Sequence, residues 1–238
     1  GVDWVSHLAA ARHSADCLRS QGLAGAMVTV YSDGAALWPS ACTRGAPRWD
    51  ATSVADAGWD PLPKDILEVL ARVYGREGLS LVPALSFDAP LPAVEALLNG
   101  PAAPGIACVG RDGRPRRLAG GGTHYNVLDP RVQAAVEATV VEMAARLRGA
   151  SAVTGVALLL SHDGWLHLPG LASGLDDATF SRFLAAAGGE DASGADRHAV
   201  RARLVEGPLR EQWLAWRATE MPPGAAPGGA DLRAAAGD

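Results

Sequence analysis

Cysteine, lysine and long apolar runs are all scarce in this chain of 238 residues, and each scarcity argues against a class of protein. The three cysteines are odd in number and far apart, so they predict neither a disulfide framework nor a CxxC metal or redox site. The longest apolar run, 153–160, is too short to cross a bilayer, and we expect no membrane partner. No signal peptide opens the sequence. Since it does not begin with Met, the compartment, cytoplasmic or exported, is left open.

Positive charge is also limited. The sequence has 21 basic and 26 acidic side chains, which gives a net charge of −5 and a pI near 5.7, and Lys64 is its only lysine. A chain without a strong positive field is poorly suited to bind nucleic acid, so we expect no such partner. Apolar residues are abundant at 48%, against 20% charged. This globular composition excludes a wholly disordered chain, a collagen and a coiled-coil rod.

Short apolar, β-rich runs alternate with amphipathic segments along the chain. Three runs, at 25–31, 79–87 and 153–160, lack polar alternation, which predicts strands buried on both faces. Helices are predicted at 3–21, 61–77, 130–148 and 195–220, with shorter ones after Asp88 and Asp176. This order predicts an α/β fold with parallel strands joined by helical crossovers.

The number of strands limits the architecture. Three strong strands do not close a barrel, which takes about eight. The pattern therefore predicts either a small open α/β sheet or an incomplete part of a (β/α)8 TIM-barrel-like domain. We expect one such segment over residues 1–220. In 221–238 Pro, Gly and Ala dominate without a periodic apolar face, which predicts a disordered tail.

Each of the three predicted strands is followed by a carboxylate: Asp33, Asp88 and Asp163. In parallel α/β folds the carboxyl ends of the strands gather on one face, where ligands bind. We therefore expect these candidate catalytic residues to converge on one rim. Structural interpretations compete, because Asp33 and Gly34 form a common turn pair and Asp88 stands where the next helix takes its N-cap. Asp163 precedes no obvious helix, which favours a functional role there.

A polar segment, Thr123-His124-Tyr125-Asn126, follows a glycine run and precedes the long predicted helix. Glycines allow unusual backbone dihedrals, and His, Tyr and Asn all form hydrogen bonds, so the segment is a candidate binding loop. The structural alternative is a loop that packs its tyrosine under the start of the helix.

Seven tryptophans outnumber the three tyrosines and three phenylalanines. Flat indole faces suit the apolar faces of sugar rings, so we expect sugar contact from one or two of the tryptophans in loops or at strand ends. These are Trp38, Trp49, Trp59 and Trp165, whereas Trp4, Trp213 and Trp216 are expected to pack helices.

Several catalytic patterns are missing from the sequence. It has no phosphate loop, no G-x-G-x-x-G that joins a strand directly to a helix, no HExxH and no G-x-S-x-G elbow. His162 and His167 flank Asp163, but their spacing gives only weak support for a metal site. The sequence therefore predicts neither a metal nor a cofactor.

Six segments are specific in combination, although each alone is weak: GAMVTVYSDGAALWPS (25–40), REGLSLVPALSFDAPLP (76–92), HYNVLDPRVQ (124–133), GVALLLSHDG (155–164), GLDDATFSRF (174–183) and WLAWR (213–217). Together they resemble the bacterial glycosyl-hydrolase-like TIM-barrel proteins often labelled family-10-like glycosylhydrolases, over roughly residues 3–220. The resemblance implies that the three predicted strands are the second, third and fourth of a barrel. Asp163 then ends the fourth strand, where many glycosidase barrels hold the general acid/base. The partner carboxylate in such barrels usually comes from a later strand, which this sequence does not show.

The first interpretation is a glycoside hydrolase acting on a poly- or oligosaccharide, in which two carboxylates flank the glycosidic bond. Asp163 is the candidate acid or base, with Asp33 or Asp88 as its partner. The candidate sugar-binding residues are Trp38, His124, Tyr125, Asn126, His162 and Trp165. An open sheet predicts weak or absent activity for this chain alone, and association through the exposed sheet edge. The alternatives are a non-catalytic carbohydrate-binding barrel and an enzyme with another substrate.

Overall fold

The computed structural model describes residues 4–45, 65–101, 103–110, 113–160, 164–166, 175–186 and 209–220. The chain divides into two compact units, which are considered separately. The sheet unit comprises residues 1–92 and 135–161, and the second unit comprises 93–134 and 162–238. The predicted tail at 221–238, most of the predicted helix at 195–220, and both Trp49 and Trp59 lie outside the described residues. The expected single segment over 1–220 stays a prediction.

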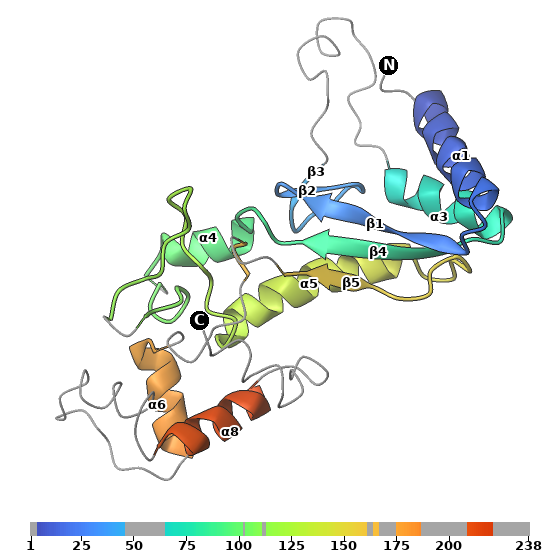
Figure 1. Cartoon of the computed structure of the whole chain (residues 1–238). Helices are drawn as coiled ribbons and strands as arrows, with labels where there is room; N and C mark the ends of the chain where they lie inside the picture. The colour runs from blue at the N-terminus through green and yellow to red at the C-terminus, as the bar shows by residue number, and fades with distance from the viewer. Residues whose placement is uncertain are drawn as a thin grey trace, which may run out of the picture. The chain divides into compact units, whose positions relative to one another are not determined.

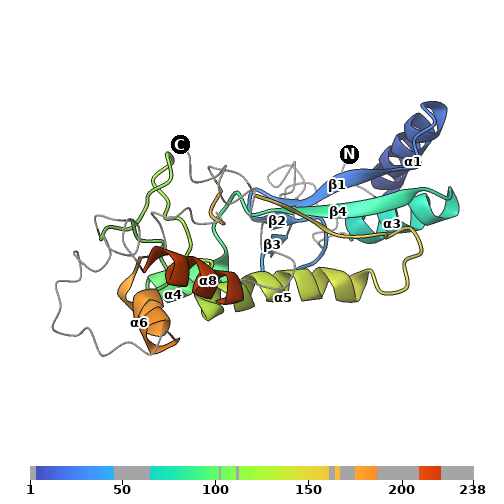
Figure 2. The same cartoon turned by 60° about the horizontal axis from the view of Figure 1, so that its bottom comes forward.

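The sheet unit is built on three parallel strands, which Figures 1 and 2 show from two directions. These are β1 (Gly25–Ser32), β4 (Ser80–Ser86) and β5 (Ala157–Leu159), and β4 lies between the other two. The predicted parallel pairing is confirmed: β1 pairs with β4 from Gly25↔Ser80 onward, and β4 pairs with β5 from Ala84↔Ala157. The third strand is shorter than predicted, because residue Val153 contributes only an isolated bridge to Leu81.

Two further strands were not predicted. They are β2 (Ala35–Ala36), which pairs antiparallel with β1, and β3 (Arg44–Gly45), which pairs parallel with β2. The described sheet is therefore open and mostly parallel, with the order β3-β2-β1-β4-β5. The fold is mixed α/β, and a TIM-barrel-like fold is not confirmed.

Helices of the sheet unit form where apolar residues recur at helical spacing. They are α1 (Trp4–Ser20), α3 (Ile66–Arg76) and the C-terminal part of α5 (Pro130–Arg146). α1 ends at Ser20, and Gly22 just beyond it has a φ of +69°, the left-handed conformation that glycine favours. Asp65 caps α3 by accepting a hydrogen bond from the Glu68 amide at 2.9 Å. The Ser14 and Tyr74 hydroxyls, 2.8 Å apart, join α1 to α3.

The second unit contains α4 (Pro92–Leu98, which begins at the unit boundary), the start of α5, α6 (Asp177–Ala186) and α8 (Arg210–Glu220). Its apolar cluster lies around α6 and α8 and consists of Leu175, Phe180, Phe183 and Trp213. As predicted, Asp176 caps α6, because its carboxylate accepts the Thr179 amide at 2.9 Å. Residues 106–109 form two isolated antiparallel bridges, Ala107↔Tyr125 and Val109↔Pro115.

Among the described residues, no helix is both long enough and apolar enough to span a bilayer.

The described sheet ends at an apolar edge strand, β5. Val156, Leu158 and Leu160 in and beside β5 are 45%, 50% and 48% exposed. An edge strand offers backbone N–H and C=O groups to another strand, and no charged side chain in 149–161 opposes such pairing.

We therefore expect Leu158→Lys to reduce self-association of the chain, because a charge on this edge repels a second copy. Sedimentation velocity over a range of protein concentrations measures the effect. Val141→Lys is the matched control, since Val141 is 56% exposed but lies on α5. Equal sedimentation of wild type and both variants would contradict association through β5.

Candidate functional site

The carboxyl ends of β1 and β4 bring two of the three predicted carboxylates together. Asp33 follows β1 directly, and Asp88 lies two residues after β4. The Asp33 amide donates a hydrogen bond to Oδ1 of Asp88 at 2.7 Å. Both residues are exposed. The parallel pairing of neighbouring strands therefore places two acidic side chains in one small region of the sheet unit.

The backbone at Asp33 has a local structural cause. Asp33 and Gly34 are the two loop residues of the β1–β2 hairpin, with φ values of +51° and +73°. Two positive φ values are what a type I′ hairpin turn requires, and Asp-Gly is a favoured pair for it. The turn interpretation of Asp33 therefore holds, and the residue is exposed.

Asp88 is held by two donors. Its Oδ1 accepts the Asp33 amide, and its Oδ2 accepts the Ser86 hydroxyl at 3.0 Å. The expectation that Asp88 caps the following helix is wrong, because α4 begins four residues later, at Pro92. Asp88 instead links the end of β4 to the β1–β2 turn, and this link fixes the position of its carboxylate.

Tyr31 is a neighbour of this pair that the sequence analysis missed. Its side chain is fully buried in β1, and its ring lies 5.3 Å from that of Phe87. Among the described residues, nothing hydrogen-bonds its hydroxyl. Burial, with a further contribution from the charge of Asp88, raises the pKa of Tyr31 to about 12. The available sequence signal was the position of Tyr31, two residues before Asp33 in a predicted strand.

The third predicted carboxylate, Asp163, and its neighbour His162 lie outside the described residues. Convergence of Asp33, Asp88 and Asp163 on one rim therefore stays a prediction. Within the described ranges, no group of three or more His, Cys, Asp or Glu side chains is arranged to hold a metal ion.

Trp38, a candidate for sugar contact, belongs to the core of the sheet unit. It is 1% exposed, and its indole N–H donates to Oε2 of Glu142 at 3.0 Å. The same carboxylate accepts the Ser40 hydroxyl at 2.5 Å and the Ala41 amide at 2.7 Å. Burial opposes the effect, but these donors and the Arg146 charge hold the pKa of Glu142 below its usual range. Trp38 therefore anchors the loop after β2 to α5, and neither face of its ring is accessible.

Tyr125 and Trp165 are in contact within the second unit. Their ring centroids are 5.2 Å apart, and Tyr125 is almost fully buried. The Tyr125 hydroxyl donates to Oε1 of Glu95 at 2.7 Å. Gly122 lies against Trp165, because a Cβ added at Gly122 would be only 2.5 Å from the Trp165 ring. Tyr125 is thus a packing residue in this structure, whereas Trp165 is half-buried. His124 is buried beside them.

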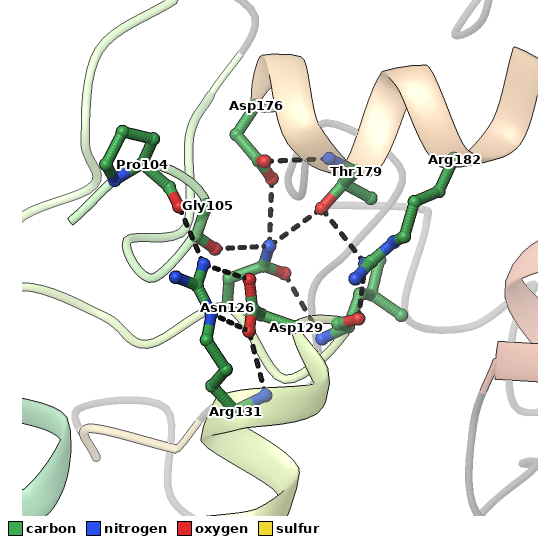
Figure 3. A network of polar contacts seen from close by, with 9 residues as sticks. Pro104, Gly105, Asn126, Asp129, Arg131, Asp176, Thr179 and Arg182 are labelled. Atoms are coloured by element: carbon green, nitrogen blue, oxygen red, sulfur yellow. Dashed lines mark hydrogen bonds and ion pairs between the residues drawn. The ribbon is translucent and has the colours of Figure 1, made fainter. Parts of the chain in front are cut away.

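Asn126 is the centre of a buried polar network in the second unit (Figure 3). Its side-chain Nδ2 lies 2.8 Å from Gly105 O, from Oδ2 of Asp176 and from Oγ1 of Thr179, so these three acceptors share its two hydrogens. Its side-chain oxygen accepts the Leu128 amide at 3.2 Å. Every polar atom of Asn126 is therefore engaged inside the protein, which makes it a structural residue.

Two buried carboxylates of this network differ in their environment. Nε and Nη2 of Arg131 donate to the two carboxylate oxygens of Asp129, at 2.9 and 2.7 Å. Burial opposes the effect, but the Arg131 bonds hold the pKa of Asp129 below its ordinary value. Asp176 has no such cation bond among the described contacts, and burial raises its pKa. The network fastens the 104–105 loop and the start of α6 to the start of α5 (Figure 3).

Comparison with known proteins gives little guidance. No known family model matches the sequence, and no curated protein matches it. Among solved structures, the chain is similar to alpha-L-fucosidase isoenzyme 2 from Paenibacillus thiaminolyticus, with 15% sequence identity and a TM-score of 0.45. The match covers 95% of this chain and 31% of that one. A likeness this weak shows neither the fold nor the activity of the chain.

Proposed function

We propose that this chain is a glycoside-hydrolase-like protein that acts on a poly- or oligosaccharide by carboxylate acid/base catalysis. The observation that carries the proposal is the contact between Asp33 and Asp88 at the carboxyl ends of two adjacent parallel strands. Both side chains are exposed, and this end of parallel strands is where α/β folds bind ligands. Hydrolysis of a glycosidic bond by the common mechanisms needs two carboxyl groups.

The surroundings of Asp88 support a catalytic role for it. Two hydrogen-bond donors hold its carboxylate in place, which suits a group that must be positioned at the bond it acts on. Asp163 is the proposed acid or base, by resemblance to glycosidase barrels, with Asp88 or Asp33 as its partner. His124, His162 and Trp165 remain the proposed sugar contacts. Trp38, Tyr125 and Asn126 serve by holding the loops in place, because their polar groups are engaged internally.

Separate Asp→Asn replacements of Asp88 and Asp163 test the proposal on a panel of 4-nitrophenyl glycosides and unlabelled oligosaccharides. Each replacement is expected to lower turnover by about 10²- to 10⁴-fold, the usual contribution of a general acid or base. Sugar binding, measured by calorimetry, should persist. Asp16→Asn on the exposed side of α1 is the matched control and should leave turnover unchanged.

The alternative is a carbohydrate-binding protein without catalysis. The half-buried Trp165, backed by the ring of Tyr125, is the observation that favours it, because a supported indole is a suitable sugar platform. Binding without turnover in the wild-type chain would establish this alternative. Absence of both binding and turnover over the whole panel would contradict both proposals.

A further inference from the structure

The exposed face of α1 carries a thiol and an imidazole in contact. Sγ of Cys17 lies 3.7 Å from Nε2 of His13, which is a hydrogen-bonding distance for sulfur. Both residues are exposed to solvent. None of the candidate catalytic or sugar-binding residues lies on this helix. The pair is therefore a nucleophile with an adjacent base, outside the site described above.

The contact follows from the spacing of the two residues. An α-helix turns by about 100° for each residue, so side chains four positions apart are neighbours on one face. The same rotation places His13 and Cys17 away from Ala11 and Ala15, the buried residues of α1. The pair is thus formed within one helix, and a small molecule in solution can reach it.

The other two cysteines are less accessible than Cys17. Cys42 is half-buried in the loop after β2, and Cys108 is 1% exposed in the second unit. Burial, with a contribution from the charge of Glu142, raises the pKa of the Cys42 thiol. Because a thiol reacts as its thiolate, both burial and a raised pKa make a cysteine less reactive.

The imidazole beside Cys17 supplies what an exposed thiol alone lacks. A base that takes the thiol proton converts the sulfur into the reactive thiolate. Nε2 of His13 accepts this proton in the imidazole tautomer whose own proton is on Nδ1. Exposure provides access, and the adjacent base provides activation.

We propose that Cys17 is a modification site that forms a mixed disulfide with low-molecular-weight disulfides, and that His13 acts as its base. Nε2 of His13 takes the thiol proton, and Sγ of Cys17 attacks one sulfur of the incoming disulfide. The S–S bond of that disulfide breaks, and its other sulfur leaves with the bonding electron pair and takes up the proton. One disulfide is consumed and one is formed, so the reaction needs no further oxidant. The proposal is independent of the proposed function.

Reaction of the folded full chain with dithiobis(nitrobenzoate), followed by the absorbance of the released thionitrobenzoate, tests the site. We expect a fast phase that corresponds to one thiol per chain. Cys17→Ser should remove this phase, and Cys42→Ser should retain it. Brief treatment with oxidised glutathione should give a single adduct, which peptide mass spectrometry locates at Cys17. A fast phase that persists in Cys17→Ser would overturn the proposal.

Replacement of His13 tests its role as the base. His13→Ala should lower the rate constant of the fast phase about fivefold, because the thiol stays exposed but loses its proton acceptor. His13→Gln keeps a polar side chain without a base and should show the same decrease. His7→Ala is the matched control, since it removes the same side chain from the same helix about 15 Å from Cys17.

The number of fast-reacting thiols also reports whether each variant is folded. A folded variant keeps Cys42 and Cys108 shielded, so a slower single-thiol phase in both His13 variants supports the proposal. Rate constants equal to that of wild type in His13→Ala and His13→Gln would overturn the role of His13. A similar decrease in His7→Ala would overturn it as well, because the effect would then not depend on contact with the thiol.

Discussion

Asn126→Ala is expected to lower the free energy of unfolding of the second unit by about 3 kcal/mol, because it leaves several buried polar groups without partners. The replacement removes the donor that serves Gly105 O, Asp176 and Thr179. It also removes the acceptor of the Leu128 amide. Asp176 is the costliest of these groups, since a buried carboxylate loses a hydrogen bond that stabilises its ionised form.

Urea unfolding followed by circular dichroism measures this loss, and Asn99→Ala is the matched control. Asn99 is exposed and its side chain donates one hydrogen bond, to Glu95 O at 2.8 Å, so its replacement should change stability by less than about 0.5 kcal/mol. Similar effects of the two replacements would mean that the Asn126 network does not hold the second unit together.

The loss at Asn126 should also depend on pH. The pKa of Asp176 is raised in the folded chain, so between its ordinary value of 3.8 and its folded value the folded state binds the proton more tightly than the unfolded state. As pH rises through this window, ionisation of Asp176 costs stability. A protonated Asp176 needs the Asn126 donor less, so Asn126→Ala should be less damaging near pH 4 than at pH 7.

The parts of the fold that could be predicted from sequence are those with a local cause. Uninterrupted apolar runs identified β1 and β4, and the alternation with helices correctly gave their parallel pairing. β2 and β3 could not be predicted, because a strand of two residues is too short to show an alternation of apolar and polar side chains. The apolar run at 153–160 continues past the residues that pair, and composition alone does not reveal that only 157–159 form β5.

In the candidate site, too, some features could be predicted from the sequence and others could not. That Asp33 and Asp88 meet follows from the topology, because residues after neighbouring parallel strands end at one edge. The burial of Trp38 could not be predicted, since its partner Glu142 is 104 residues away on a helix. Likewise, the sequence places Tyr31 two residues before Asp33 but does not show that its hydroxyl lacks a partner among the described residues, because only the packed structure shows which groups are paired.

Glu142→Gln is expected to destabilise the sheet unit by about 2–3 kcal/mol at pH 7, although it changes one atom. Oε2 of Glu142 accepts from Trp38 and Ser40, and Oε1 accepts the Ala41 amide. A glutamine can present its oxygen to only one of these sides. Its NH₂ then faces a donor on the other side, so either the Ala41 amide or the buried Trp38 N–H loses its acceptor.

The pH dependence of this effect separates the lost charge from a general disturbance of α5. The pKa of Glu142 is lowered in the folded chain, so its contribution to stability is present above the ordinary value of 4.5 and is lost as pH falls through the folded value. Wild type and Glu142→Gln should therefore converge in stability at acid pH. Glu137→Gln, at an exposed position of the same helix, should change stability by less than about 0.5 kcal/mol at either pH. A difference between wild type and Glu142→Gln that is constant from pH 3 to pH 7 would show that the loop after β2 is not held by the ionised carboxylate.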